Sequence, residues 1–62
     1  MCLSTVYKNE KTEDAVAARY VASVEVRGKE VVLTDIIGAE TVIEGSLRFV
    51  DLTGGTVIIQ TV

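Results

Sequence analysis

Short runs of apolar residues recur along the chain, and glycines or charged residues separate them. In the clearest run, Val24 and Val26 alternate with the polar residues Ser23, Glu25 and Arg27. A period of two is typical of a strand with one buried face, and β-branched residues such as those in the runs favour strands over helices. The pattern predicts an all-β chain with strands over residues 2–8, 16–27, 30–36, 40–44, 46–52 and 56–61.

Glycines mark the turns and bends between these strands. Gly28 lies in a tight hairpin turn, Gly45 marks a bend or bulge, and the pair Gly54-Gly55 forms the turn before the last strand. Residues 8–14 are rich in charge and are predicted as a polar turn. This spacing of short strands, together with the absence of proline, is typical of a small barrel.

Two segments need a separate prediction. Residues 13–20 contain three alanines and follow Thr12, which is a suitable cap, so a helical turn is the alternative to a strand there. In residues 46–52 the alternation places Leu47, Phe49 and Asp51 on one side of the strand.

Adjacent apolar residues occur within several of the predicted strands. Neighbours on a strand point to opposite faces, so both faces of the sheet need cover at these points. In a one-layer barrel the second cover is another subunit, which favours a dimer. The alternative is that some of these side chains are exposed, which is normal for single apolar residues. The runs are Val31-Val32-Leu33, Ile36-Ile37, Val42-Ile43 and Val57-Ile58-Ile59.

The chain has 62 residues, of which 48% are hydrophobic and 24% charged, and its net charge is −3. This composition predicts one globular domain over residues 1–62. So small a domain usually needs a disulfide, a metal or a partner subunit for support. One cysteine excludes an internal disulfide, and histidine, the commonest metal ligand, is absent. A partner subunit is therefore the expected support, with an unusual metal site as a possible addition.

Charge and hydropathy bear on location and partners. The sequence shows no signal-peptide pattern and no apolar run of membrane length, and a lone cysteine suits a reducing interior, so we expect a cytoplasmic protein. Six basic residues are dispersed among nine acidic ones. Only Tyr7, Tyr20 and Phe49 offer rings for base stacking. Both features disfavour a nucleic-acid partner.

The residue types do not fit the common catalytic sites. Without histidine, neither a Ser-His-Asp nor a Cys-His arrangement is available, and the chain has no Walker loop and no GxGxxG run. We therefore expect no catalysis by this chain alone. Acidic residues with no metal-site spacing are expected on a solvated surface. They include Asp14, Asp35, Glu40, Glu44 and Asp51.

Cys2 directly follows Met1, and this position gives it a chemistry that a mid-chain cysteine lacks. A chain terminus offers a free amine, and Ni(II) or Cu(II) favours nitrogen-rich planar sites that include deprotonated backbone amides. A Cys2 thiolate adds a soft donor, and two chains on a twofold axis would bring two thiolates to one ion. Zinc fits less well, because one chain offers one sulphur and no imidazole. The alternative is that Cys2 is simply a small buried apolar residue.

The opening run Met1-Cys2-Leu3-Ser4-Thr5-Val6-Tyr7 resembles the start of the CooT family of small nickel-binding proteins. The similarity covers nearly the whole chain, through residues 24–26, 28–36, 42–45 and 50–52. The Met-Cys start combined with Val50-Asp51-Leu52 is its most specific part.

This resemblance implies a homodimer of small SH3-like barrels that binds nickel(II) at the dimer interface through Cys2. Met1, through its amine or backbone, and Leu3, through its amide, are the implied nitrogen donors. Any further ligand comes from backbone or from the other subunit, because Leu3 has no side-chain donor. The implied role is that of a metallochaperone or nickel reservoir in the maturation of carbon monoxide dehydrogenase. The implied partners are that enzyme or its maturation proteins, with no membrane.

Two other functions are weighed against this one. The chain is alternatively an SH3-like adaptor that docks on another protein, with Cys2 incidental. The third hypothesis is RNA binding by the barrel surface, which the net charge disfavours.

Overall fold

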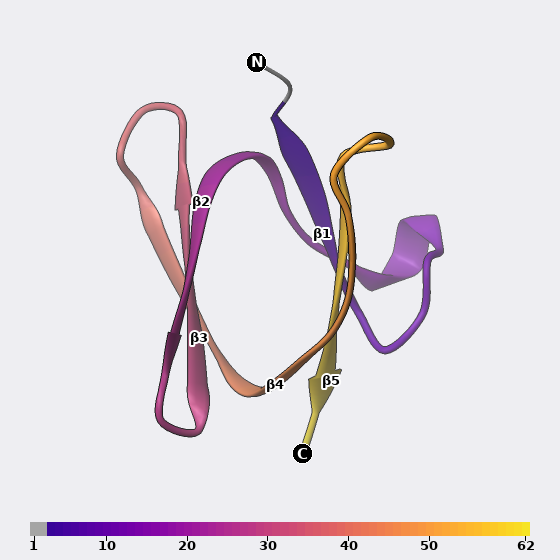
Figure 1. Ribbon diagram of the computed structural model, residues 1–62, viewed down its shortest axis with the longest axis vertical. Helices are drawn as coiled ribbons and strands as arrows, with labels where there is room; N and C mark the ends of the chain where they lie inside the picture. The colour runs from indigo at the N-terminus through magenta and orange to yellow at the C-terminus, as the bar shows by residue number, and fades with distance from the viewer. Residues whose placement is uncertain (1–2) are drawn as a thin grey trace.

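The computed structural model describes residues 3–62, which form five strands and one short 3-10 helix (Figure 1). The strands close into a ring in the order β1-β2-β3-β4-β5. Every neighbouring pair is antiparallel except β1 and β5, which run parallel. The predicted all-β fold is confirmed. The elements are β1 (Ser4–Lys8), η1 (Glu13–Ala15), β2 (Val16–Arg27), β3 (Glu30–Asp35), β4 (Glu40–Asp51) and β5 (Thr56–Thr61).

The core lies inside this ring and takes side chains from all five strands. Its members are β-branched or leucine, as the sheet pattern requires, and each is almost fully buried. They are Val6, Val21, Val31, Leu33, Ile43, Val57 and Ile59.

The two long strands, β2 and β4, each pair with one neighbouring strand along their first part and with another along their second part. β2 pairs first with β1 and, from Val21 onward, with β3. β4 pairs with β3 up to Glu44 and with β5 from Gly45. The sequence predicted two strands separated by Gly45, whereas the structure has one strand that changes partner there. Gly45 is needed because a Cβ at this position would collide with the Gln60 carbonyl oxygen of β5.

Three further predictions need correction. Leu47 and Phe49 do not share a face, because a register shift lies between them: Leu47 pairs with Ile59 and Phe49 with Ile58. Of the helical alternative for residues 13–20, only η1 is helical, and β2 begins at Val16. The predicted strand 30–36 ends one residue earlier, so Ile36-Ile37 lies in a turn.

The apolar runs are covered in different ways. Val32 faces away from the core cluster but is buried within the subunit, so it gives no argument for a second subunit. Val42, Ile36 and Ile37 are instead exposed. Of these runs, the exposed residues thus include Val42 within β4 and the pair Ile36-Ile37 in the turn that follows β3.

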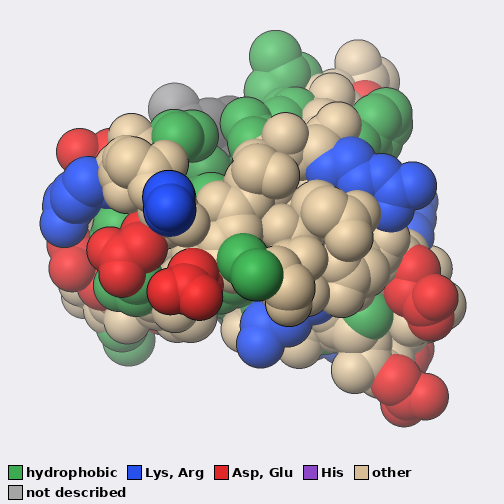
Figure 2. Space-filling model, turned by 90° about the horizontal axis from the view of Figure 1, so that it is seen from below, with side chains coloured by type: hydrophobic (Ala, Val, Ile, Leu, Met, Phe, Trp, Pro, Cys, Tyr) green, Lys and Arg blue, Asp and Glu red, His purple; other side chains and the backbone are tan. Residues whose placement is uncertain are grey.

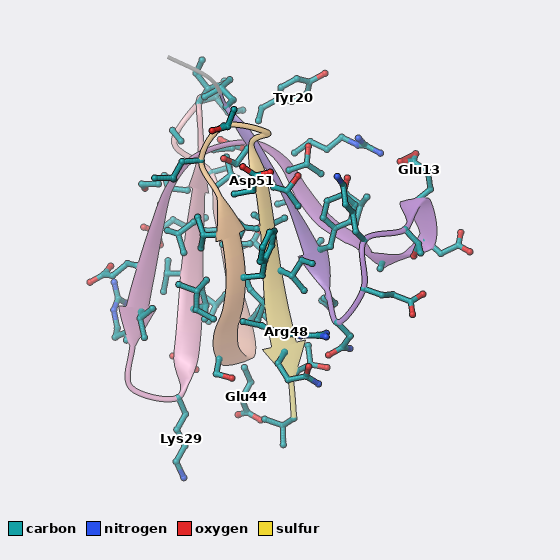
Figure 3. The ribbon with its side chains drawn as sticks, turned by 45° about the vertical axis from the view of Figure 1, so that its right-hand side comes forward. Glu13, Tyr20, Lys29, Glu44, Arg48 and Asp51 are labelled. Atoms are coloured by element: carbon teal, nitrogen blue, oxygen red, sulfur yellow. The ribbon has the colours of Figure 1, made fainter. Side chains whose placement is uncertain are left out.

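The ring has two ends of different character. The N-terminal end contains the start of β1, the bend of β2 at Tyr20, and the β3–β4 and β4–β5 turns (Figure 1). At the opposite end, here called the hairpin end, lie the β2–β3 turn, the bend of β4 and the last residues of β5. Figure 3 shows Tyr20 and Asp51 at the first end and Lys29 and Glu44 at the second.

The hairpin end is held by polar contacts. The Asn9 side-chain amide donates to Thr61 Oγ1 at 2.9 Å, and the Thr61 backbone amide donates to Asn9 Oδ1 at 2.9 Å. Charged side chains of both signs surround this end (Figure 2). In residues 3–62, no helix has the length and apolar character needed to cross a membrane.

Candidate functional site

Of the three residues proposed as metal ligands from the sequence, only Leu3 is described by the structure. Met1 and Cys2 lie outside the described residues. Leu3 is half-buried and immediately precedes β1. Its position fixes where the chain enters the fold, and the site is built up from its surroundings.

The chain enters between the bend of β2 and the β4–β5 turn. Ser4 pairs with Val21 of β2, and the Thr5 amide donates to the Gly55 carbonyl at 2.9 Å. A Cβ on Gly55 would lie 3.2 Å from the Leu3 carbonyl oxygen, which is closer than most side chains tolerate. Gly55 also has a φ of 67°, a left-handed conformation that glycine adopts without steric cost. A glycine at this position therefore lets the β4–β5 turn pack closely against Leu3.

Asp51 organises the β4–β5 turn that carries Gly55. Its Oδ1 accepts hydrogen bonds from the backbone amides of Thr53 at 3.0 Å and Gly54 at 2.9 Å. This is the Asx-turn role of a short carboxylate. The sequence indicated Val50-Asp51-Leu52 as a distinctive piece but assigned Asp51 no role, and the structure gives it a part in shaping the entry point of the chain.

Asp35 plays the same part in the β3–β4 turn. Its Oδ1 accepts from the backbone amides of Ile37 and Ala39, both at 3.0 Å. Asp35 and Asp51 were expected to be solvated surface acids, and both are instead partly buried turn caps at the N-terminal end. Residue type alone did not reveal this, because the acceptor role depends on the amides that the folded turn presents.

Tyr20, at the bend of β2, has an unusual backbone conformation. Its φ is 57°, a left-handed value that is rare for a bulky residue. The Tyr20 carbonyl accepts a hydrogen bond from the Ile36 amide at 3.0 Å, which ties the bend to the β3–β4 turn. The side chain itself is exposed. Sequence reasoning counted Tyr20 only as an aromatic residue and missed this bend.

A groove opens beside the entry point, between the second halves of β2 and β4. Its volume is about 340 Å³, and its floor is formed by the buried residues Val21 and Val57. Its walls are mostly apolar, with two serines among them. They comprise Ala22, Ser23, Val24 and Val26 of β2, Leu47 and Val50 of β4, Leu52 of the following turn, and Ser4 of β1.

Two ion pairs join exposed side chains of the described residues. Glu25 raises the pKa of Arg27 through a 2.7 Å ion pair, and the charges of Glu40 and Glu30 add to the effect. A second exposed ion pair joins Arg19 to Glu13 at 3.0 Å. Within residues 3–62, no three Cys, His, Asp or Glu side chains are grouped as metal ligands. The described part of the site thus offers backbone groups and apolar cover, and a thiolate donor could come only from Cys2, the single cysteine of the sequence.

Comparisons with known proteins agree with the resemblance noted in the sequence. The family model described as CO dehydrogenase accessory protein CooT matches residues 1–60. A crystal structure assigned as CooT from Carboxydothermus hydrogenoformans superposes with a TM-score of 0.83 at 16% sequence identity, covering 98% of each chain. At this level of identity the match supports the fold. No curated protein matches the chain.

Proposed function

Because the chain belongs to the CooT family of CO dehydrogenase accessory proteins, we propose that it is a nickel(II)-binding homodimer of small SH3-like barrels. Nickel is its cargo, held for delivery during maturation of carbon monoxide dehydrogenase, or kept as a reserve. The observation that carries the proposal is the family match, which spans residues 1–60 and so includes the Met1-Cys2 start. The role is that of a cytoplasmic carrier and not of an enzyme.

The proposed ligand is the Cys2 thiolate, with the Met1 amine or backbone and the Leu3 amide as nitrogen donors. Thiolate and deprotonated amide nitrogens are the donors of planar nickel sites. A second copy would contribute its own Cys2 at a shared interface. The described surroundings support this arrangement, because Gly55 and Asp51 fix the path of the chain at Leu3, one residue from the thiol.

Apolar cover also suits a thiolate site. The groove beside Ser4 is lined by valine and leucine, which limit water access to groups bound near it. The chain itself contributes donors that must lose protons, so nickel affinity should fall as pH falls below the ordinary thiol pKa of about 8.5. For each proton released, the expected loss is about tenfold per pH unit.

A calorimetric nickel titration of the tag-free full chain tests the proposal. We expect one nickel per two chains and a sulphur-to-nickel charge-transfer band in the absorption spectrum. Cys2→Ser should abolish both, whereas the matched variant Leu3→Ile, which keeps every backbone donor, should retain both. Equal nickel affinity in Cys2→Ser and the parent would contradict the proposal.

One observation favours the second candidate, an adaptor that docks on another protein. The apolar groove is open and about 340 Å³ in volume, and exposed apolar grooves often mark interaction sites. An adaptor with Cys2 incidental would bind no nickel tightly. The same titration therefore separates the two functions.

A further inference from the structure

The outward face of β2, β3 and β4 carries four glutamates around a pair of valines. Val31, Leu33 and Ile43 of these strands point into the core, so their neighbours along each strand point outward. The register of the strands arranges the outward residues in three rows that cross the sheet, and together they are called the acidic face below. The rows are Ser23-Thr34-Glu40, Glu25-Val32-Val42 and Arg27-Glu30-Glu44.

The acidic face accounts for the whole net charge of the protein. The chain has nine acidic and six basic residues, which gives a net charge of −3. Four of the acidic residues and one basic residue, Arg27, lie on this face, so the face also carries −3. The remaining five acidic and five basic residues balance one another. The excess negative charge is therefore gathered on one side of the molecule.

Arg27 does not neutralise this charge for a partner, because it is already engaged. Its guanidinium donates to the Glu25 carboxylate at 2.7 Å. The pKa of Arg27 is raised mainly by this hydrogen bond and also by the charges of Glu40 and Glu30, so three of the four carboxylates act on one cation. The acidic face thus has negative charge left over for a cation from outside.

Two of the glutamates oppose each other directly. Glu30 of β3 pairs with Glu44 of β4. Like charges at opposite positions of neighbouring strands destabilise a sheet. Both residues are exposed, and Figure 3 shows Glu44 at the hairpin end. The pair costs the isolated subunit stability, whereas a cation placed between the two carboxylates would be attracted by both.

The centre of the acidic face is apolar. Val32 lies in the middle strand and the middle row, and it is only 2% exposed although it points away from the core. Val42 beside it is 53% exposed. An apolar centre with charged residues around it is the layout of a protein interface. In the part of the chain that the structure describes, no three acidic side chains are grouped as metal ligands, so this layout suits a protein partner better than a metal ion.

We propose that the acidic face docks a basic protein surface, one that places lysine or arginine side chains around a small apolar centre. Charge complementarity selects this occupant. A second copy of this face, a nucleic acid or an anionic membrane would each bring negative charge against negative charge. The proposal goes beyond the nickel role and does not depend on Cys2, since the entry point of the chain around Leu3 is not part of the face.

An NMR titration of the tag-free, nitrogen-15-labelled full chain tests the proposal. The probe is a capped five-residue peptide with a central valine and two lysines on each side. Its binding should shift the amide signals of residues 23–27, 30–34 and 40–44, and it should weaken as salt rises from about 50 mM to about 300 mM. The same peptide with glutamates in place of the lysines should shift none of these signals.

Two double variants with equal charge show whether the face itself is recognised. Glu30→Gln combined with Glu44→Gln should weaken binding of the lysine peptide at least about fivefold. It should unfold in urea no more easily than the parent, because the like-charge pair is removed. The matched control, Glu10→Gln combined with Asp14→Asn, removes the same charge from exposed residues outside the face and should keep the affinity within about twofold.

Two results would overturn the docking face. One is a set of shifted amides that lies mainly outside the acidic face. The other is equal weakening in the two double variants, which would make the attraction a property of net charge alone. Cys2→Ser separates this proposal from the nickel proposal, because it should lose nickel and bind the peptide as the parent does.

Discussion

The two long strands bend at opposite ends of the ring and by different means. β4 changes partner at Gly45, at the hairpin end, where only a glycine fits against the Gln60 carbonyl. β2 changes partner next to Tyr20, at the N-terminal end, where a bulky side chain takes a left-handed conformation. At the first bend, a glycine avoids the steric clash because it has no side chain. The second keeps a side chain at a cost in strain, and that side chain faces solvent.

The surroundings of the two bends differ in the same sense. The hairpin end satisfies its polar groups internally, through the contacts between Asn9 and Thr61. At the N-terminal end, aspartate side chains cap the two turns in a similar way. The residues that these turns expose to solvent, however, are isoleucine and leucine. The hairpin end thus ties its last strand to the chain after β1, whereas the turns of the N-terminal end leave large apolar side chains exposed. Four substitutions test this difference, beginning with the largest expected effect.

Gly45→Ala should be the most damaging change, because a Cβ would meet the Gln60 backbone and neither strand can move freely. We expect a loss of about 3 kcal/mol or more in the free energy of unfolding, measured by urea denaturation. Gly28→Asn is the control, because Gly28 has open space around it and asparagine tolerates its left-handed φ. Equal stability of Gly45→Ala and the parent would show that the bend is not tightly packed.

Gly55→Ala should cost about 1–2 kcal/mol, because alanine is strained at this φ and would press on the Leu3 carbonyl. It should also weaken nickel binding, since the chain start is displaced. Gly38→Ala is a close match, with a φ of 90° but nothing within 4 Å. It should lose similar stability and keep full nickel affinity in the same titration. Equal nickel affinities in the two variants would separate Gly55 from the metal site.

Asn9→Ala should cost about 1–2 kcal/mol, through the lost hydrogen bonds to Thr61 and the strain of alanine at a φ of 70°. Asn9→Gly keeps the conformation and loses only the hydrogen bonds, so urea denaturation of both variants divides the two terms. Neither should change nickel affinity or dimerisation, because this contact lies at the hairpin end. A change in either property would show that the two ends are coupled.

Tyr20→Asn should have the smallest effect on folding and the opposite sign. Asparagine accepts the left-handed conformation more readily, so the subunit should gain about 1 kcal/mol of stability. Urea denaturation measures this gain. A variant that is less stable as a monomer would show that the Tyr20 ring supports the subunit itself.

Much of the fold follows from local pattern. β2 and β5 have the bounds that alternation and flanking turns predicted, and the all-β fold follows from β-branched composition. The continuity of β4 through Gly45 was not predictable in this way, because glycine is equally consistent with a turn. The register shift between Leu47 and Phe49 depends on pairing with β5, which is distant in sequence.

In the candidate site, the sequence indicates some residues and the structure reveals the others. Cys2 and Met1 stand out from position and chemistry alone, before any fold is known. The roles of Asp35, Asp51 and Gly55 depend on which backbone groups the turns present, and the left-handed Tyr20 contradicts its own local preference. The sequence therefore indicates the candidate donor, whereas the contacts around Leu3 are known only from the structure.

The parallel pairing of β1 with β5 has a mechanical consequence. Both strands run in the same direction, so the start of β1 and the end of β5 lie at opposite ends of the ring (Figure 1). A pull applied to the two termini would load the hydrogen bonds between these strands together, in shear, instead of peeling them apart one at a time. A chain tethered to a surface by its last residue would accordingly present the start of β1 on the side away from the support.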